Sequence, residues 1–368
     1  MKKISFAGPS ITQKEIDYVI DATRNGFYEN YITHTRKLEA KLAEYLEVKY
    51  VIATHCCTHA LHLAALSLGL GEGDEVIVTD FSWVATAHSI AYTGAKCVFV
   101  DIDKDSWCID PEAIKAGITD KTKAIMLVHS FGQTAEMDKI MDIANEYNLS
   151  VIEDAAPALG SKYKGKKVGT FGDIGCFSFQ GAKLTVSGEG GAFVTNDEVL
   201  YNKALLLSSM GRTDSNGVFW SDYIGYQYTI ANLTAALALA QVERIDELIS
   251  IKRSIFDRYE KNLNAISGIK IIKEKKDCFS NYCYPSILLE ESILTERDFI
   301  LAELRKNNIH CRPAFPQMSS FPMYESRHNN NVAELVGRRG ISLSSAAELT
   351  MDDIDFVSEC LIKLITYK

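Results

Sequence analysis

Short apolar runs alternate with longer helical patterns from residue 50 to about residue 195. The runs are four or five residues long and rich in Val and Ile: YVIAT, EVIVT, CVFVD, AIMLV, SVIED and AFVT. Runs of this kind are typical of strands that are buried on both faces. Helical patterns such as THALHLAALSL and AEMDKIMDIANEY lie between them. The alternation predicts an α/β fold with a mainly parallel sheet covered by helices.

The pattern changes in the last third of the chain. A helical stretch begins at Asn232 (NLTAALALAQVERIDEL), and a second one follows it. Residues 265–368 then carry two strand candidates, IKII and YPSILLE, a helix candidate, and a last helix that Thr350 opens with a capping-box-like sequence. The chain has 368 residues, which is long enough for two cores. We predict a large domain at residues 1–250 and a smaller α/β domain at residues 251–368.

The composition excludes several classes of protein. The formal net charge is −9, so no general attraction to nucleic acid or to anionic membranes is expected. No apolar run approaches the roughly 20 residues of a membrane helix, and MKKISFAGPSITQKE does not have the pattern of a signal peptide. The nine cysteines are scattered and lack the spacing of a metal site. We therefore expect a cytoplasmic protein with reduced thiols and no metal.

Parallel sheets bind ligands beyond the carboxyl ends of their strands, so the loops after the strands are the first place to look for a site. Asp154 ends the SVIED strand, where a buried carboxylate is costly unless a cation pairs with it. One interpretation is a helix N-cap for the residues that follow. The other is an acceptor for the protonated ring nitrogen of a bound cofactor.

A polar loop rich in glycine follows, with the sequence GAKLTVSGEGG around Lys183. Its glycines allow the backbone to approach a ligand closely. Ser178, at the end of the GCFSF strand, offers a hydroxyl to a phosphate. Glycine with lysine also suggests a P-loop, but the GxxxxGK[ST] pattern is absent. A single lysine in a loop is usually only solvated. A functional role for Lys183 is therefore supported by these neighbours and not by the lysine itself.

Two further loops complete the predicted site. In YVIATHCCTHALHLAAL a strand passes into a helix whose first turn, at Cys57 and Thr58, favours an anion. The alternative is an ordinary joint with Thr58 as the helix N-cap. Trp83 follows the EVIVT strand; it belongs either to the core or to a face that stacks on an aromatic ring.

Together these segments resemble the DegT/DnrJ/EryC1/StrS family of nucleotide-sugar aminotransferases, which depend on pyridoxal phosphate. The resemblance runs from Pro9 to the final helix. Its most specific part is SFQGAKLTVSGEGG, which is similar to the family's Ser-Phe-His-x-x-Lys followed by Gly-Glu-Gly-Gly. EDAA, YKGKKVGTFGD, ALHLA and AKCVFVDID are also similar. The resemblance implies a fold-type-I aminotransferase that forms a homodimer with shared active sites.

The family's residue roles carry over position by position. Lys183 would hold the cofactor covalently, Asp154 would pair with the pyridine nitrogen, and Trp83 would stack on the ring. The cofactor's phosphate would be held by Cys57, Thr58 and Ser178. Gln227, in GYQYT, would reach the phosphate of the other subunit.

Several positions depart from the family pattern. His55-Cys56-Cys57-Thr58 replaces Ser-x-Gly-Thr, and a positive φ at residue 57 would be costly for cysteine. The remaining departures are Pro157 for Gln, Gln180 for His, Gln227 for Asn, and Met318 for a His. They affect contacts to the sugar more than the choice of cofactor.

The Lys…Gly-Glu-Gly-Gly form is similar to family members that act at C4 of a nucleotide-linked 4-keto-6-deoxy sugar, with glutamate as the amino donor. The resemblance favours a dTDP-linked glucose derivative as the substrate, for surface-polysaccharide or glycan biosynthesis. The alternatives are a GDP- or UDP-linked sugar, a C3-keto sugar, and a non-catalytic protein of the same fold that acts as a regulator. Lys183 argues against a related branch that carries histidine there and dehydrates the sugar.

Overall fold

The computed structural model describes residues 2–213, 215–217 and 219–366. In this part of the chain, seven strands form one sheet in the order β1-β9-β8-β5-β4-β2-β3. The strands are β1 (Tyr50–Thr54), β2 (Glu75–Thr79), β3 (Lys96–Val100), β4 (Thr122–Val128), β5 (Ser150–Asp154), β8 (Ile174–Ser178) and β9 (Gly191–Thr195). Neighbours from β3 to β8 pair in parallel, whereas β9 is antiparallel to both β8 and β1. The predicted mainly parallel sheet is confirmed.

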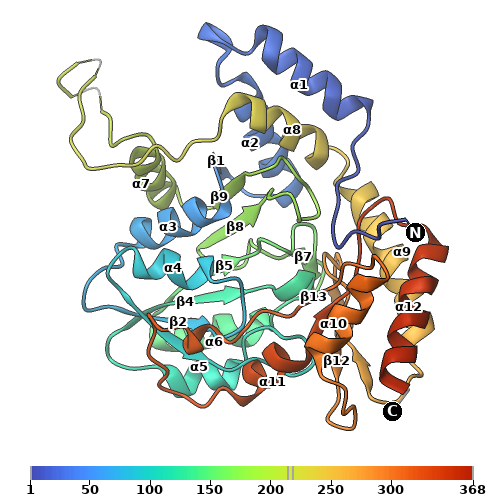
Figure 1. Cartoon of the computed structure of the whole chain (residues 1–368). Coiled ribbons are helices and arrows are strands. Elements are labelled where there is room, and N and C mark those ends of the chain that lie inside the picture. The colour runs from blue at the N-terminus through green and yellow to red at the C-terminus, as the bar shows by residue number, and fades with distance from the viewer. Residues whose placement is uncertain (1, 214, 218, 367–368) are drawn as a thin grey trace.

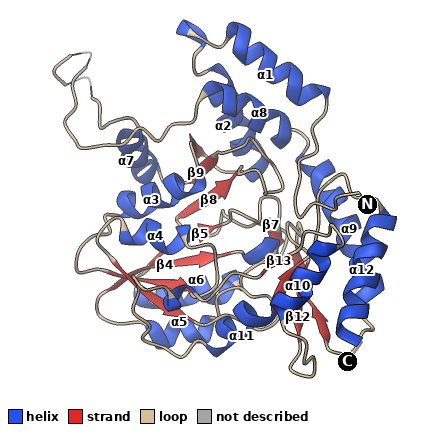
Figure 2. Cartoon of the chain, viewed as in Figure 1, coloured by secondary structure: helices blue, strands red, loops and turns tan. Residues whose placement is uncertain are grey.

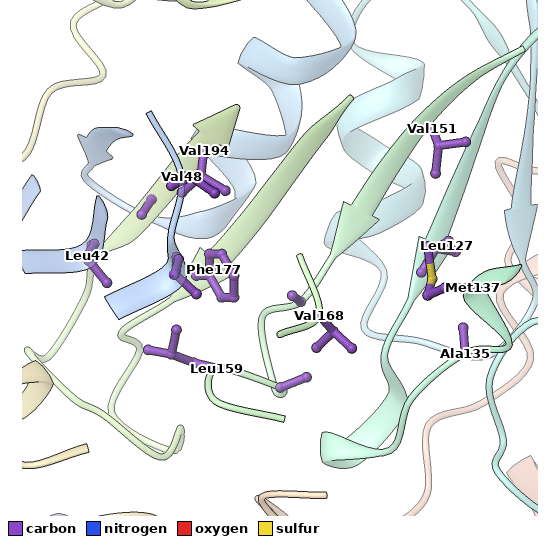
Figure 3. Packing of buried hydrophobic residues seen from close by; sticks show 14 of the residues in the cluster. Leu42, Val48, Leu127, Ala135, Met137, Val151, Leu159, Val168, Phe177 and Val194 are labelled. Carbon is purple, nitrogen blue, oxygen red and sulfur yellow. The ribbon is translucent and has the colours of Figure 1, made fainter. Parts of the chain in front are cut away.

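Helices cover both faces of this sheet (Figures 1 and 2). One face packs against α3 (Cys57–Leu68), α4 (Ala85–Ala91) and α7 (Glu198–Ser208). The other face packs against α2 (Thr33–Leu46), α5 (Pro111–Gly117), α6 (Met137–Tyr147) and α8 (Asn232–Val242). Figure 3 shows part of this second core, which includes Leu42 of α2 and Val194 of β9.

The strand sequences explain the two faces. In β2, Val76 and Val78 belong to the core under α3, and Ile77 belongs to the opposite core. Successive side chains of a strand point to opposite faces, so a strand buried on both sides must be apolar at nearly every position. The continuous Val and Ile runs of the sequence satisfy this requirement.

The C-terminal part forms a second sheet with the order β10-β12-β14-β13, in which every pair is antiparallel. Its elements are β10 (Ile269–Ile271), β12 (Ser286–Leu289), α10 (Arg297–Lys306), β13 (Arg312–Pro313), α11 (Asn331–Arg339), β14 (Gly340–Ser342) and α12 (Met351–Thr366). Thr350 and Asp353 exchange hydrogen bonds at the start of α12, as the capping-box-like sequence predicts. The remaining elements are α1 (Gln13–Asn25), β6 (Lys162–Tyr163), β7 (Lys166–Lys167), β11 (Cys278–Phe279) and the short 3-10 helices Tyr28–Asn30, Ser130–Gly132 and Met318–Ser320.

Helix α9 (Ile245–Leu263) connects the two sheets. Leu248 belongs to the core of the large sheet, whereas Phe256 and Tyr259 belong to the core of the small sheet. The proposed boundary between residues 250 and 251 falls inside this helix. The division into 1–250 and 251–368 stays a prediction, with α9 as the shared element.

The helical stretch from Asn232 ends earlier than its sequence indicates. α8 stops at Val242, because Arg244 (φ −110°, ψ 12°) leaves the helical conformation. Its guanidinium donates to Glu15 Oε1 at 2.6 Å, to Glu247 Oε1 at 2.7 Å and to Ser10 Oγ at 2.8 Å. A partner from the N-terminal segment therefore sets the break, which helix propensity within the stretch does not reveal.

Glu15 closes the capping box of α1 and is 1% exposed. Burial opposes its charge, but hydrogen bonds from Thr12 and Arg244 outweigh burial and lower the pKa of Glu15 to about 2. A carboxylate with a lowered pKa in the folded state stabilises the fold above its unfolded-state pKa, and the stabilisation is lost as the pH falls toward the folded value.

We predict that Glu15→Ala lowers the free energy of unfolding at pH 7 by about 3 kcal/mol, because it removes the buried carboxylate that pairs with Arg244 and closes the capping box of α1. The deficit should shrink as the pH falls from 4.5 toward 2. Glu247→Ala is the matched control, since its side chain pairs with the same arginine but is 56% exposed, and it should cost less than about 1 kcal/mol. Urea unfolding measures both variants; equal losses would contradict the account.

Candidate active site

A cavity of about 420 Å³ opens at the carboxyl-end edge of the large sheet. Six of the seven predicted site residues line it, although they come from segments far apart in the sequence: Cys57, Thr58, Trp83, Asp154, Ser178 and Lys183. The parallel topology explains this meeting, because β2 and β5 end at the same edge and the loops after them lie side by side. Gln227 is the one predicted residue that does not line the cavity.

Asp154 is the last residue of β5 and is 4% exposed. Its Oδ2 accepts a hydrogen bond from Thr86 Oγ1 at 2.7 Å, and its Oδ1 accepts one from the Ala156 N–H at 3.1 Å. Turns rather than a helix follow it, so the helix N-cap interpretation is wrong. Burial raises the pKa of Asp154, and the two hydrogen bonds and the charge of Lys183 oppose the rise. A cation in the cavity would favour its ionised form.

Lys183 projects into the same cavity, and its Nζ lies 5.6 Å from the ring centroid of Tyr284. The Tyr284 hydroxyl donates to the carbonyl of Ala182 at 2.9 Å, which ties the lysine's loop to the small sheet. The Lys183 N–H donates to the Gln180 carbonyl at 2.8 Å and closes a turn. Gly190 (φ 149°) allows the loop to fold back, since a Cβ there would lie 2.7 Å from Ser187 Oγ.

The N-terminus of α3 forms another wall. Cys56 is the N-cap with extended backbone (φ −159°), so Thr58 is not the cap, and Cys57 begins the helix without a positive φ. The first turn of a helix leaves amide groups free for an anion. Gly191 of β9 makes room here, because a Cβ at that position would lie 2.5 Å from the Cys57 nitrogen. Burial and the neighbouring Asp154 raise the pKa of Cys57, which keeps its thiol neutral.

Trp83 and Ser178 place an aromatic ring and a hydroxyl in the cavity wall. Trp83 is 62% exposed and tilts against Phe315 with ring centroids 6.1 Å apart. It is therefore not a core residue. Ser178 ends β8 and is 6% exposed, and its Oγ accepts a hydrogen bond from the Gln180 N–H at 3.3 Å. Its hydroxyl hydrogen stays available to a ligand.

Gln227 is exposed and lies in the segment between α7 and α8. Its Nε2 donates to Thr229 Oγ1 at 3.0 Å.

The other positions that depart from the family pattern differ in where they lie. Pro157 and Gln180 line the cavity, whereas Met318 is fully buried in the core under α3.

The sequence did not single out Thr86, Tyr284 or Arg312, which also line the cavity. Thr86 follows Trp83 by three residues, about one helical turn. The sequence could therefore have indicated that both side chains face the same cavity. Tyr284 and Arg312 belong to the small sheet region, and they reach the site only through the packing of that sheet. No local pattern separates Arg312 from the other arginines of the chain.

These groups fit a cofactor with a phosphate and a protonated aromatic ring. The helix N-terminus with Thr58 and Ser178 suits a phosphate. A buried carboxylate suits a cationic ring nitrogen, and an amine lies in the same cavity. The fold and the site together define an aminotransferase of fold type I.

The chain belongs to the DegT/DnrJ/EryC1/StrS aminotransferase family, whose model matches residues 9–362. It is 43% identical to the GDP-perosamine synthase of Escherichia coli O157:H7 over 98% of each chain. It is 37% identical to the GDP-perosamine synthase of Caulobacter vibrioides over 99% of each chain. A structure described as a sugar aminotransferase of Streptococcus pneumoniae in its PLP form is 27% identical, with a TM-score of 0.91 over 99% of this chain and 98% of that one.

The protein is therefore a nucleotide-sugar aminotransferase that depends on pyridoxal phosphate. The predicted fold and cofactor are confirmed. The dTDP-linked glucose derivative expected from the sequence is not confirmed, since these two relatives are GDP-perosamine synthases. Within the described ranges, no helix has the length and apolar character needed to span a membrane.

We predict that Asp154→Asn lowers kcat by at least about a hundredfold while the cofactor still binds, because the substitution removes the charge and keeps the shape. The spectrum of the purified variant measures binding, and single-turnover reaction with glutamate measures the chemistry. Thr86→Val serves as the control, since it removes one hydrogen bond to the carboxylate but not the charge, and it should cost less than about tenfold. An Asp154→Asn enzyme with wild-type activity would refute the pairing of this carboxylate with the cofactor's ring nitrogen.

Proposed function

We propose that the protein transfers the amino group of glutamate to C4 of a GDP-linked 4-keto-6-deoxy sugar, for surface-polysaccharide or glycan biosynthesis. The observation that carries the reaction type is the placement of Lys183 and Asp154 in one cavity with the N-terminus of α3. The support for GDP is the similarity to two GDP-perosamine synthases over nearly the whole chain.

The residue roles follow from the geometry and remain part of the proposal. The N-terminus of α3, Thr58 and Ser178 bind the cofactor's phosphate, and Asp154 holds a proton on the ring nitrogen. Pyridoxal phosphate supplies the electron-withdrawing ring that stabilises negative charge at the reacting carbon. In the first half-reaction the amine of Lys183 removes a proton from the α-carbon of glutamate as a general base. In the second half-reaction it delivers a proton to C4 of the sugar as a general acid.

A non-catalytic regulator of the same fold was the alternative that the sequence left open. Such a protein has no need for a lysine that lines the cavity without an ion-pair partner among the described residues. The whole set of cavity groups therefore favours an enzyme. Glutamate turnover by the purified protein would separate the two proposals directly.

We also propose a homodimer with shared active sites. Large apolar side chains are exposed on the segment between α7 and α8 and just after α1, and a partner subunit that covers them would remove them from water. They include Phe27 (54% exposed), Tyr28 (91%), Phe219 (91%) and Ile224 (92%). Gln227 lies in the segment between α7 and α8 and outside the cavity of its own chain, so its predicted contact would be made to the partner's cofactor.

The nucleotide is tested by incubating the holoenzyme with glutamate and GDP-, dTDP- and UDP-linked 4-keto-6-deoxy sugars, with products detected by mass. We expect kcat/KM for the GDP-linked sugar to exceed that for the dTDP-linked sugar by at least about tenfold, equivalent to roughly 1.4 kcal/mol of differential binding. Preference for dTDP would restore the first expectation from the sequence. No amination of any sugar would contradict the proposed function.

The shared site is tested with mixed dimers of Lys183→Ala and Gln227→Ala subunits. If Gln227 acts on the partner's site, one site in the mixed dimer carries both defects and the other carries none. Activity should then rise above that of both parents. Gln227→Ala alone should lose about tenfold, the size expected for one hydrogen bond to a charged group. Absence of rescue would place Gln227 in its own subunit's site or outside both.

A further inference from the structure

The chain around Gln227 is extended and runs from the end of α7, which packs beside α3, to the end of β1 (Figure 1). The Tyr226 N–H donates to the Leu207 carbonyl at 2.7 Å, and the His55 N–H donates to the Tyr228 carbonyl at 2.9 Å. Successive side chains of an extended chain point to opposite sides. Gln227 therefore points away from the side on which the two flanking tyrosines pack.

Two histidines of α3 contact these tyrosines. The ring of His59 stacks on the ring of Tyr228, with centroids 3.8 Å apart and an interplanar angle of 7°. His62 lies about one turn further along α3. Its Nδ1 is 3.1 Å from the Tyr228 hydroxyl, and its ring meets the ring of Tyr226 edge-on at 5.1 Å. The first two turns of α3 thus hold the inner side of the extended segment.

The opposite side of the segment faces away from the chain's own cavity. Gln227 is exposed, and its Nε2 donates to Thr229 Oγ1 at 3.0 Å. Neither residue lines the cavity around Lys183. A glutamine side chain loses conformational entropy when it is fixed in one contact. The backbone that carries it must therefore be held in place, because any shift of the segment moves the amide with it.

Both histidine rings are neutral near pH 7. Burial, with a smaller effect from the charge of His55, lowers the pKa of His59. Burial lowers the pKa of His62 to about 4. The stack of His59 on Tyr228 is therefore a contact between two uncharged flat rings, and a phenylalanine at residue 59 can replace it.

His59 also lies next to the candidate phosphate site of its own chain, because Thr58 directly precedes it in the first turn of α3. A change at residue 59 can therefore act on its own subunit through Thr58 or on the partner subunit through Gln227. The ring of His59 faces Tyr228 and does not line the cavity. This orientation favours the second route.

We propose that His59 is a positioning residue for the active site of the partner subunit. Its stack on Tyr228 holds the extended segment in the place from which Gln227 reaches the partner's cofactor phosphate. The inference rests on the proposed homodimer with shared active sites. It goes beyond that proposal, because it gives a residue of α3 an effect on the site of the other subunit. The α3 helix of one subunit thereby sets how tightly the other subunit holds its cofactor.

The first test titrates the apoenzyme with pyridoxal phosphate and follows the absorption of the lysine-bound cofactor. We expect His59→Ala to weaken binding about fivefold, the size of one aromatic pair, and His59→Phe to stay within about twofold of wild type. His59→Ala combined with Gln227→Ala should bind no more weakly than Gln227→Ala alone, because both changes act through one contact. His88→Ala is the matched control and should bind like wild type, since its ring contacts Tyr92 and Tyr324 instead.

Mixed dimers separate an effect on the partner from an effect on the subunit's own site. His59→Ala subunits are paired with Lys183→Ala subunits, so only the His59→Ala subunit can bind the cofactor covalently. Its site receives Gln227 from a subunit with an intact stack. We expect its affinity for pyridoxal phosphate and its turnover per covalent site to return to within about twofold of wild type. Tyr228→Leu removes the same stack from the other side and should give the same pattern.

Affinity that stays weakened in the mixed dimer would assign the effect of His59 to its own subunit and overturn the proposal. Unchanged affinity of the His59→Ala homodimer, or an additive loss in the double variant, would contradict it as well. The shared site is judged separately by the mixed dimer of Lys183→Ala and Gln227→Ala. Absence of rescue there would overturn the shared site and the inference together. Rescue there without rescue of His59→Ala would overturn the inference alone.

Discussion

The buried carboxylate of Asp154 is the constraint on which the site depends. A carboxylate with 4% exposure is costly, and the hydroxyl of Thr86 and the N–H of Ala156 offset only part of that cost. The position at the end of a central parallel strand makes the arrangement possible. The end of the neighbouring strand β8 supplies a hydroxyl, and α3, which follows β1, supplies its N-terminus around the same cavity. The protein therefore keeps a poorly satisfied negative charge where a cationic ring is to be bound.

The residue before Asp154 has the opposite role. Glu153 is fully buried, and its carboxylate accepts hydrogen bonds from the N–H groups of Gly169, Phe171 and Gly172 and from His129 Nε2. His129 Nδ1 accepts from the Ala135 N–H, so Nε2 is the ring nitrogen that donates to Glu153. The two adjacent carboxylates on opposite faces of β5 thus have different roles. The carboxylate of Glu153 has all its hydrogen bonds made within the protein and stabilises the loop that carries Gly169, Phe171 and Gly172. The carboxylate of Asp154 can still accept a hydrogen bond from a ligand.

The sequence was most informative where a function depends on local pattern. The strands of the large sheet were predictable because a strand buried on both faces must be apolar throughout. The place of Asp154 and Lys183 at the cavity was predictable because Asp154 ends a strand and Lys183 follows one at the carboxyl-end edge of the sheet, whereas their roles stay predictions. The break at Arg244 was not predictable, because its cause is a contact with Glu15, more than two hundred residues away. Arg312 was missed for the same reason, since only the packing of the small sheet brings it to the cavity.

The central claim is that Lys183 is the lysine that holds pyridoxal phosphate. Borohydride reduction of the holoenzyme, followed by peptide mass analysis, tests it most directly, because reduction makes the bond between cofactor and lysine permanent. Lys252 is an informative competitor: burial lowers its pKa to about 8, but its Nζ donates to Ser345 Oγ at 3.0 Å and it does not line the cavity. The account predicts one cofactor per chain on the peptide that contains Lys183. A label on Lys252 or on any other lysine, or no label on a protein that shows the cofactor's spectrum, would contradict it.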